Sequence, residues 1–369
     1  LKQLGFNGSN EQILKSAYKF SKVLLSNFTS ASSMWAANAA TISPSFDTQD
    51  KKTHITPANL KSMFHRSIET EFTFNQCKLI FKGNCFKVHE PALSISGRGD
   101  EGAANHLRIS RSHNEKGFEI FVYGDSGFSR DNLSIKRQAL EVSKSIANNH
   151  KLDDENTFFL QQNSEAIEMG SFHNDIVSLS NENIFIAHEK AFQDRNKLTK
   201  LLKNLEAKID NFQFIEISDS EIPLKNIIDS YLLNSQLATN GQNEMMLILP
   251  EEVKSYETCM AWLDKLKQIS DIKLYDFVNI RQSMMNGGGP ACLRLKVVLD
   301  ENETKELNQN FLMTSEKLDA IKSLIEREYR DNLHPDDLPD PNLLDESRRV
   351  LDELTQIFDV GSIYEFQKL

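Results

Sequence analysis

A cysteine follows three consecutive glycines and a proline in residues 286–292 (NGGGPAC). Glycine permits positive φ and lets a ligand approach main-chain N–H groups, and Pro290 stiffens the exit from the loop. Apolar and basic residues alternate over residues 293–299, which predicts a β-strand with one buried face. We therefore expect Cys292 to lie where a tight, ligand-accessible loop enters a strand.

Two simpler interpretations of this loop stay open at this point. A glycine-rich loop can cradle phosphate, but such loops lead into a helix and carry either a Lys-Ser/Thr ending or a GxGxxG pattern. Residues 286–292 have neither. A lone cysteine can also be a small buried hydrophobic residue that does no chemistry.

An imidazole and several carboxylates could act together with the thiol. His173 and Asp175 are two residues apart, so on a strand both would face one pocket. A protonated histidine beside Cys292 would raise its thiolate fraction, because a free thiol has a pKa of about 8.5. The pair Asp100-Glu101 adds carboxylates between two glycines. A thiolate, an imidazole and two acids suit attack on a cationic, planar carbon, whereas acyl transfer would use backbone oxyanion donors.

Other polar side chains have ordinary explanations as well as functional ones. Asn38 interrupts a predicted strand, as a satisfied core amide does, but it could also face a ligand. His65 and Arg66 lie on a predicted amphipathic helix, where they could be solvated or could hold a carboxylate. Arg137 lies on a second predicted helix and has the same two interpretations.

The elements that must position these side chains recur in a similar order. Units of strand, strand, helix and strand, each of roughly 60–70 residues, predict a closed ring of α/β modules around a central site. The predicted strands span residues 34–43, 78–81, 117–123, 158–163, 176–180, 184–188, 212–217, 244–249 and 272–275, with a short strand near residue 54. The predicted helices span residues 11–26, 134–148, 221–238, 251–268, 314–331 and 343–358, with another beginning at Thr56-Pro57 and a long one between 188 and 212.

Composition excludes several classes of function. The 369 residues are 39% hydrophobic and 26% charged, with a net charge of −11 and dispersed basic residues, which argues against a nucleic-acid-binding surface. No apolar run is long enough to span a bilayer. The four cysteines form no CxxC pair and no HExxH motif occurs, so we expect neither a metal site nor a cofactor. Few cysteines and no signal peptide predict a cytoplasmic protein.

Five motifs together resemble the N-succinylarginine dihydrolases, which belong to the wider guanidine-modifying (pentein) superfamily. They are NGGGPACLRLKVVL, FHNDIVSLSN, GDEGAANH, MWAANAATISPS and NLKSMFHRS, and the likeness runs from Leu1 to about Gln367. The resemblance implies an α/β fold of the pentein type, a five-bladed propeller of ββαβ-like repeats. It implies one catalytic domain over residues 1–369 with a helical C-terminal part from about 301 to 369. Family members begin upstream of Leu1, so we expect this chain to lack part of the first repeat.

The resemblance also implies an activity and a set of site residues. The reaction is hydrolysis of N-succinylarginine by two waters to succinylornithine, two ammonia and carbon dioxide, through a covalent thiouronium on Cys292. His173 and Glu101 would complete the catalytic set, in a cytoplasmic homodimer without cofactor. The substrate-binding positions would be Asn38, His65, Arg66, Arg137, Asp175 and Asn286.

Three alternatives stay open from the sequence. The chain could be a related arginine deiminase or amidinotransferase, which stops after one ammonia or passes the amidine to an amine. It could be a non-catalytic remnant that binds ligand without turnover. A papain-like hydrolase fits less well, because its cysteine opens a helix near the mature N-terminus.

Overall fold

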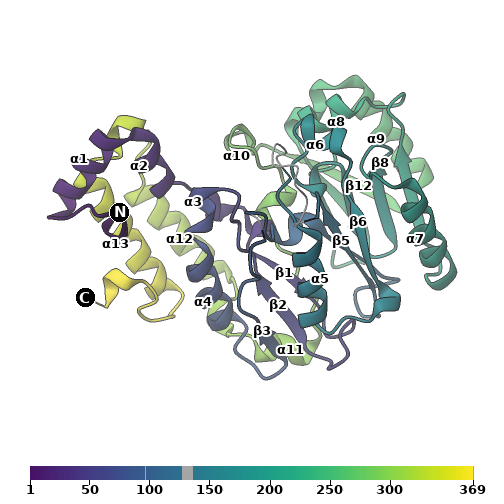
Figure 1. The fold of residues 1–369 in the computed structure, drawn as a ribbon, viewed down its shortest axis with the longest axis horizontal. Coiled ribbons are helices and arrows are strands. Elements are labelled where there is room, and N and C mark those ends of the chain that lie inside the picture. The colour runs from purple at the N-terminus through teal and green to yellow at the C-terminus, as the bar shows by residue number, and fades with distance from the viewer. Residues whose placement is uncertain (96, 127–135, 369) are drawn as a thin grey trace. The chain divides into compact units, whose positions relative to one another are not determined.

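The computed structural model describes residues 1–95, 97–126 and 136–368, which form two compact units (Figure 1). One unit is Ser33–Thr304, and the other combines Leu1–Ser32 with Lys305–Leu369. The prediction of a single catalytic domain over residues 1–369 stays a prediction. Among the described residues, no helix has the length and hydropathy needed to cross a bilayer.

Ser33–Thr304 contains four three-stranded sheets of identical topology. In each sheet the first two strands are antiparallel, and the third is parallel to the second. The sheets are β1 (Ala40–Ser43), β2 (Thr53–Pro57) and β3 (Phe86–Val88); β4 (His106–Ile109), β5 (Phe118–Tyr123) and β6 (Thr157–Gln161); β7 (Ser178–Asn181), β8 (Ile184–His188) and β9 (Gln213–Ile217); and β10 (Gln236–Thr239), β11 (Met245–Pro250) and β12 (Ile272–Val278).

A helix connects the second and third strands of every sheet, because two parallel strands need a crossover connection. These helices are α4 (Thr70–Ile80), α5 (Leu140–Asn149), α7 (Arg195–Lys208) and α9 (Glu257–Ile269). Leu198, Leu201 and Leu205 form the buried face of α7 at helical spacing. The four ββαβ modules confirm the predicted α/β fold class, whereas closure into five blades stays a prediction.

The first strands of successive modules lie side by side, so that β7 contacts both β4 and β10. The second strands are more deeply buried, and every residue of β5 and of β8 is buried. Strands covered on both faces are rich in β-branched and aromatic residues, as β8 (IFIAH) is. Trp262 of α9 and Phe185 of β8 belong to one hydrophobic core with these strands.

Shorter helices lie in the connections of this unit. They are α3 (Phe64–Ser67), α6 (Ser164–Glu168), α8 (Leu224–Ser230) and α10 (Arg281–Met285). Helix α11 (Glu301–Glu306) spans the boundary between the two units.

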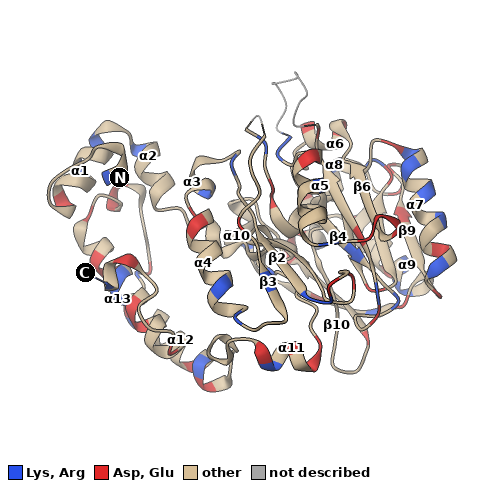
Figure 2. Ribbon diagram, turned by 60° about the horizontal axis from the view of Figure 1, so that its bottom comes forward, with Lys and Arg blue, Asp and Glu red and all other residues tan. Residues whose placement is uncertain are grey.

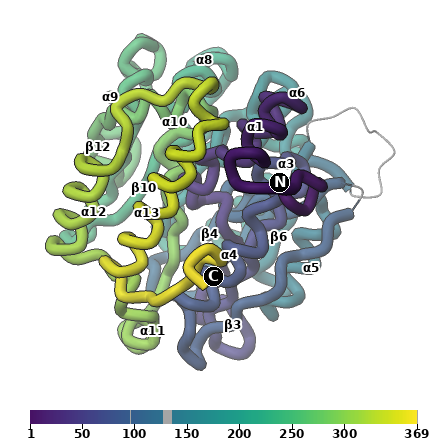
Figure 3. The backbone as a smooth tube through the Cα atoms, turned by 90° about the vertical axis from the view of Figure 1, so that its left-hand side faces the viewer, coloured from purple at the N-terminus to yellow at the C-terminus, as the bar shows by residue number. Residues whose placement is uncertain are grey.

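The second unit consists of helices α1 (Asn10–Phe20), α2 (Lys22–Phe28), α12 (Ser315–Glu328) and α13 (Pro341–Ile357). Figure 3 shows α12 and α13 running beside each other, and they are in contact. The predicted helix over 11–26 is broken at Ser21, whose hydroxyl accepts from the N–H of Leu24 and caps α2. Figure 2 shows acidic and basic residues interspersed on α12 and α13 and mostly basic ones on α7, as expected for solvated faces.

Several sequence predictions in the first module are wrong. Thr56 and Pro57 end strand β2 and do not begin a helix, because Pro57 pairs with Ala40 at the end of the ladder. Residues 78–81 complete α4, so the third strand comes later, at Phe86–Val88. The predicted strand over 34–43 is a strand only from Ala40, after 3₁₀ turns at Ser32–Met34 and Ala36–Asn38.

The predictions around the site residues also need correction. Helix α5 begins at Leu140, so Arg137 precedes it, and residues 134–135 of the predicted helix lie outside the described residues. Asp175 lies in a 3₁₀ turn, Asn174–Ile176, so it does not share a strand face with His173. The predicted helix over 221–238 divides into α8 and β10. Cys292 lies in a 3₁₀ turn, Ala291–Leu293, and residues 294–300 pair with no strand of the described chain.

The other predicted elements agree with the structure. Strands β5, β6, β9, β11 and β12 and the hairpin of β7 and β8 occur where the alternating pattern places them. Helices α7, α12 and α13 also match, and residues 251–268 form a 3₁₀ turn followed by α9.

Candidate active site

The three glycines allow the cysteine loop to pack against its neighbours. A Cβ atom at Gly289 would lie 2.4 Å from Asn234 Oδ1, and one at Gly288 would lie 2.1 Å from Trp35 Nε1. Only Gly287 of the three has a positive φ, of 100°. The loop is thus shaped by close side-chain contacts, and Cys292 is buried at 5% exposure.

The thiol of Cys292 contacts an amide and a carboxylate. Its Sγ lies 3.3 Å from Asn234 Oδ1 and 3.9 Å from Asp175 Oδ2. Burial and the negative charge of Asp175 raise the pKa of the Cys292 thiol well above its ordinary value, against smaller opposing effects of Asn234, the Gly289 backbone and Arg66. In the free protein Cys292 is therefore a thiol at neutral pH.

Asp175 is held beside the thiol with unused acceptor capacity. Asn234 Nδ2 donates to the main-chain oxygen of Asp175 over 3.2 Å. The carboxylate Oδ1 is buried and has no hydrogen-bond partner among the described residues. Burial raises the pKa of Asp175 to about 6. A carboxylate in this state can accept hydrogen bonds from a cationic ligand that reaches the thiol.

His173 and Glu101 are both buried, and their side chains lie at ion-pair distance. His173 Nε2 lies 2.9 Å from Glu101 Oε2, and the hydroxyl of Ser62 donates to Glu101 Oε1 over 2.7 Å. Burial alone would raise the pKa of Glu101, but the hydrogen bond and charge of His173 hold it below its ordinary value. The hydrogen bonds of the described residues join His173 to Glu101, and they join Cys292 to Asn234 and Asp175.

Two amides fix the backbone of Glu101. Asn38 Nδ2 donates to the main-chain oxygen of Glu101, and the N–H of Glu101 donates to Gln138 Oε1, both over 2.7 Å. Gln138 Nε2 also donates to Asp100 Oδ1 over 3.1 Å. Gln138 therefore holds both Asp100 and the backbone of Glu101, and the Glu101 carboxylate contacts His173.

Two arginines, Arg66 and Arg137, lie near Glu101, and their guanidinium groups have hydrogen-bonding capacity left for a ligand. Arg66 is buried, its Nε has no hydrogen-bond partner among the described residues, and its guanidinium lies 5.4 Å from the centroid of the Trp35 ring. Arg137 Nη1 lies 3.9 Å from Glu101 Oε2, and its guanidinium stacks 4.4 Å from the centroid of the Phe172 ring. Such cations can bind carboxylates with charge-assisted hydrogen bonds.

The remaining two candidates differ in position. His65 is half-buried next to Arg66, and burial followed by the charge of Arg66 lowers the pKa of His65. Asn286 is exposed at the end of α10, where its amide donates to the main-chain oxygen of Gln282 over 2.8 Å. The structure thus brings most of the candidates into one buried region but leaves Asn286 at the surface.

Sequence reasoning missed Asn234, Gln138, Ser62 and Phe172. Asn234 fell within the helix predicted over 221–238, so no motif singled it out. Gln138 and Ser62 lie close to candidate residues in the sequence, but only the folded loops bring them to Glu101. No group of three or more His, Cys, Asp or Glu among the described residues is arranged to hold a metal ion.

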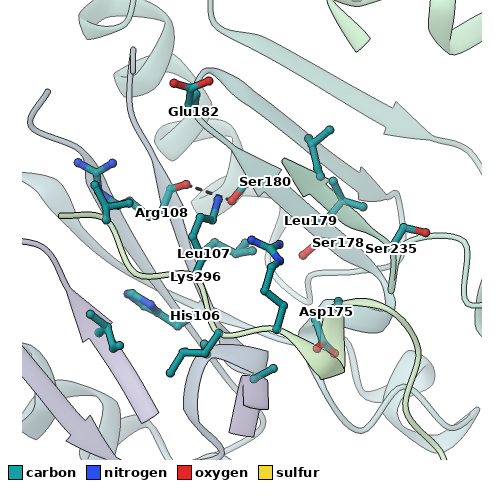
Figure 4. A pocket seen from close by; sticks show the side chains of 18 of the residues that line it. His106, Leu107, Arg108, Asp175, Ser178, Leu179, Ser180, Glu182, Ser235 and Lys296 are labelled. Atoms are coloured by element: carbon teal, nitrogen blue, oxygen red, sulfur yellow. Dashed lines mark hydrogen bonds between the residues drawn. The ribbon is translucent and has the colours of Figure 1, made fainter. Parts of the chain in front are cut away.

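A cavity of about 120 Å³ adjoins this region, and we call it the central cavity (Figure 4). Asp175 and Ala291, next to the thiol, form one part of its wall. Residues of β4, β7 and β10 and residues 294–298 form much of the rest, together with residues of β1 and of the adjoining loops.

The family model and the curated relatives indicate one family. The model of the family described as succinylarginine dihydrolase matches residues 1–367. The chain is 44% identical to the N-succinylarginine dihydrolase of Aliivibrio fischeri and 42% identical to that of Pseudoalteromonas atlantica, covering 100% of this chain and 84% of each relative. Among solved structures, it is similar to ArgZ, an arginine dihydrolase from cyanobacteria, with a TM-score of 0.48 and 16% identity over 82% of this chain and 39% of that one.

Proposed function

The chain belongs to the succinylarginine dihydrolase family, and we propose on this basis how its site performs the reaction. The activity is hydrolysis of N-succinylarginine with two waters to N-succinylornithine, two ammonia and carbon dioxide. The family match over residues 1–367 is the observation that carries this assignment. The buried thiol beside unsatisfied carboxylate and guanidinium groups supports it.

The substrate has opposite charges at its two ends, and the candidate residues divide in the same way. We assign the guanidinium to Asp175 and Glu101, which are acids near the thiol and the imidazole. We assign the carboxylates to Arg66, Arg137 and His65. Asn38 and Asn286 are assigned to hydrogen bonds with the substrate, and for Asn286 this requires a change from its hydrogen bond with Gln282.

The thiol has to be activated by the substrate itself. Burial and Asp175 disfavour the thiolate, and no histidine is hydrogen bonded to Sγ among the described residues. A guanidinium that contacts both Asp175 and Cys292 would offset the charge of Asp175 and favour the thiolate. The nucleophile would then form only when its target carbon is bound.

The chemical steps follow from these positions. When the guanidinium binds, the Cys292 thiol loses its proton to solvent, the thiolate forms a C–S bond with the guanidinium carbon, and the C–N bond to one terminal nitrogen breaks. His173 gives its proton to that nitrogen, which leaves as ammonia, and then removes a proton from the attacking water. The water releases the ureido product and restores the thiol. A second round on this product releases the second ammonia and leaves a carbamate, which loses carbon dioxide.

Counting ammonia tests this assignment directly. We expect two ammonia per N-succinylarginine and none from free arginine. A Cys292→Ser variant should lose turnover by more than about 10³-fold while still binding the substrate, because serine keeps the shape of the site but is a far weaker nucleophile here. One ammonia per substrate would indicate a deiminase, and full activity of the variant would exclude Cys292 as nucleophile.

The family resemblance also leads us to propose a cytoplasmic homodimer. Analytical ultracentrifugation and cell fractionation would test these two points separately from the chemistry.

A further inference from the structure

Two basic side chains that line the central cavity form no ion pair within 4.0 Å with any acid among the described residues. Residues 294–298 pass along its wall, and Arg294 and Lys296 both line it. Figure 4 shows the Lys296 side chain pointing into the space between Arg108 and Ser180. This segment has no strand partner among the described residues, so its position is set by these side chains and their surroundings.

Arg294 has unsatisfied hydrogen-bonding capacity. Its Nε is buried and has no hydrogen-bond partner among the described residues. In the described parts of the chain no carboxylate oxygen lies within 4.0 Å of its guanidinium. A half-buried guanidinium without an anion is costly, since an uncompensated charge has lost part of its hydration.

Lys296 is in a similar state. Its Nζ donates to one neutral acceptor, Asn181 Oδ1, over 2.7 Å, although an ammonium has three donors. Burial, followed by the charges of Arg294 and Arg108, lowers the pKa of Lys296 to about 7. The two cations therefore destabilise each other in the absence of an anion.

Apart from Asp175, whose Oδ1 has no hydrogen-bond partner among the described residues, the other charges of the cavity are already paired. Arg108 binds Asp47 through two nitrogens, with Nη2 3.0 Å from Oδ1. His106 contacts Glu119. Glu182, the acid that acts on Lys296, already accepts from the Thr239 hydroxyl over 2.6 Å and from the N–H of His113 over 3.2 Å.

We propose that the central cavity binds one small oxyanion between the guanidinium of Arg294 and the ammonium of Lys296. The planar fork of an arginine matches two oxygens of a carboxylate or phosphate, and a lysine adds a point charge. A volume of about 120 Å³ holds such an ion together with several waters. This site is distinct from Arg66 and Arg137, to which we assign the substrate carboxylates, and it does not depend on the proposed function.

Thermal unfolding of the full chain tests the site, with inorganic phosphate and acetate as probes at constant ionic strength. A ligand that binds only the folded state raises the unfolding midpoint in a saturable way. We expect a rise of several degrees with at least one probe. Lys296→Met and Arg294→Gln should abolish this rise, whereas Lys296→Arg should retain it. Lys200→Met and Arg281→Gln, at exposed positions, should behave as the wild type does.

Each result decides for or against the site. Without any probe, Lys296→Met should unfold at an equal or higher temperature than the wild type, since a half-buried charge without an acid in hydrogen-bond contact has been removed. Stabilisation by phosphate alone indicates an inorganic oxyanion, and stabilisation by acetate alone indicates a carboxylate ligand. The proposal is overturned if neither probe acts saturably on the wild type, or if the Lys296→Met and Arg294→Gln variants respond as the wild type does. No substrate is used, so failure here would leave the proposed activity untouched.

Discussion

The most consequential residue contact is the one between Cys292 and Asp175. An acid 3.9 Å from a buried thiol works against the thiolate that the chemistry needs, yet the same acid is suited to hold a guanidinium. The two demands are compatible only if the acid is neutralised at the moment of attack. We therefore expect the resting thiol to react slowly with electrophiles that are not cations.

Replacing Asp175 by asparagine should change two rates in opposite directions. At pH 8 Asp175 is ionised, since its pKa is about 6, and its charge raises the pKa of the thiol. Asp175→Asn removes that charge, so alkylation of Cys292 by iodoacetamide should become faster, about tenfold for each unit by which the thiol pKa falls. Turnover of N-succinylarginine should fall by 10²-fold or more, to the order expected for lost acid–guanidinium contacts. The Cys292→Ser variant gives the alkylation background, and slower alkylation of Asp175→Asn would contradict the assigned role.

A methyl group at Gly289 should disable the site through Asn234. The added Cβ would lie 2.4 Å from Asn234 Oδ1 and 2.8 Å from the Tyr231 ring, so the amide that contacts the thiol must move. We expect Gly289→Ala to lower kcat by at least about tenfold and to cost about 1–3 kcal/mol of unfolding free energy in urea titrations. Gly241→Ala is the matched control, because nothing lies within 4 Å of its Cβ position and φ is not positive there, so it should change stability by less than about 0.5 kcal/mol. Normal kcat in Gly289→Ala would show that the contact is dispensable.

Residue types indicated the thiol, the imidazole and the acids, but not how they pair. The two-residue spacing of His173 and Asp175 predicted one strand face, and the chain instead turns between them, sending His173 to Glu101 and Asp175 to Cys292. Asn234 could not be predicted, since its role depends on the missing side chain of Gly289 fifty-five positions later. Pairing of this kind is set by tertiary packing, on which local patterns carry no information.

At the scale of elements, the alternation of apolar and polar residues predicted strands correctly inside the modules but not at their edges. Strands β5, β8 and β9 are fully or partly buried runs of β-branched and aromatic residues, and their pattern predicted them. Residues 294–299 have the same alternation but pair with no strand among the described residues. A pattern reports which faces are apolar, whereas a strand also needs a neighbour to accept its hydrogen bonds.

A histidine cluster shared by the first and second modules should make stability depend on pH. His54 Nδ1 lies 2.7 Å from His89 Nε2, and His150 is hydrogen bonded by its two ring nitrogens to Ser43 and Thr56. Burial lowers the pKa of all three, that of His89 to about 4. A histidine with a lowered folded pKa contributes stability above its unfolded pKa, near 6.5, and loses it as pH falls toward the folded value.

His89→Gln tests this dependence. Between pH 6.5 and 4 the unfolding midpoint of the wild type should fall more steeply than that of His89→Gln, because the variant cannot take up the proton. The contribution of His89 itself should be on the order of 1–3 kcal/mol over this range. His334→Gln, at an exposed histidine of the helical unit, should follow the wild type. Parallel pH profiles for wild type and His89→Gln would contradict the assignment.

At the scale of the whole molecule, all candidate site residues lie in Ser33–Thr304. The helical unit has its own ion-pair network, in which Arg330 Nε lies 2.7 Å from Glu346 Oε2 and Nη2 lies 2.9 Å from Asp340 Oδ2. These contacts join the end of α12 to the beginning of α13.

Arg330→Ala should therefore separate stability from chemistry. Amide hydrogen exchange in α12 and α13 should become faster, since the variant loses the pairs that tie the two helices together. The kcat and KM for N-succinylarginine should stay within twofold of the wild type, as expected when the altered residue lies outside the unit that contains the candidate site. Lys322→Ala, whose acid partner is one turn away at 4.0 Å, is the control and should leave the exchange rates nearly unchanged. A large loss of kcat in Arg330→Ala would instead support the prediction of one catalytic domain over residues 1–369.

Trp35 gives this protein an optical reporter of its own site. The chain has two tryptophans, and Trp262, on the buried face of α9, lies in the core, where its emission should be constant. Trp35 lies under the guanidinium of Arg66, and its indole N–H donates to Ser283 Oγ over 3.2 Å, next to the cysteine loop. A carboxylate that binds Arg66 changes the field across that indole, so ligand binding should alter the intensity and wavelength of its fluorescence. Occupancy could then be followed in real time without an attached dye, even in variants that no longer turn over substrate.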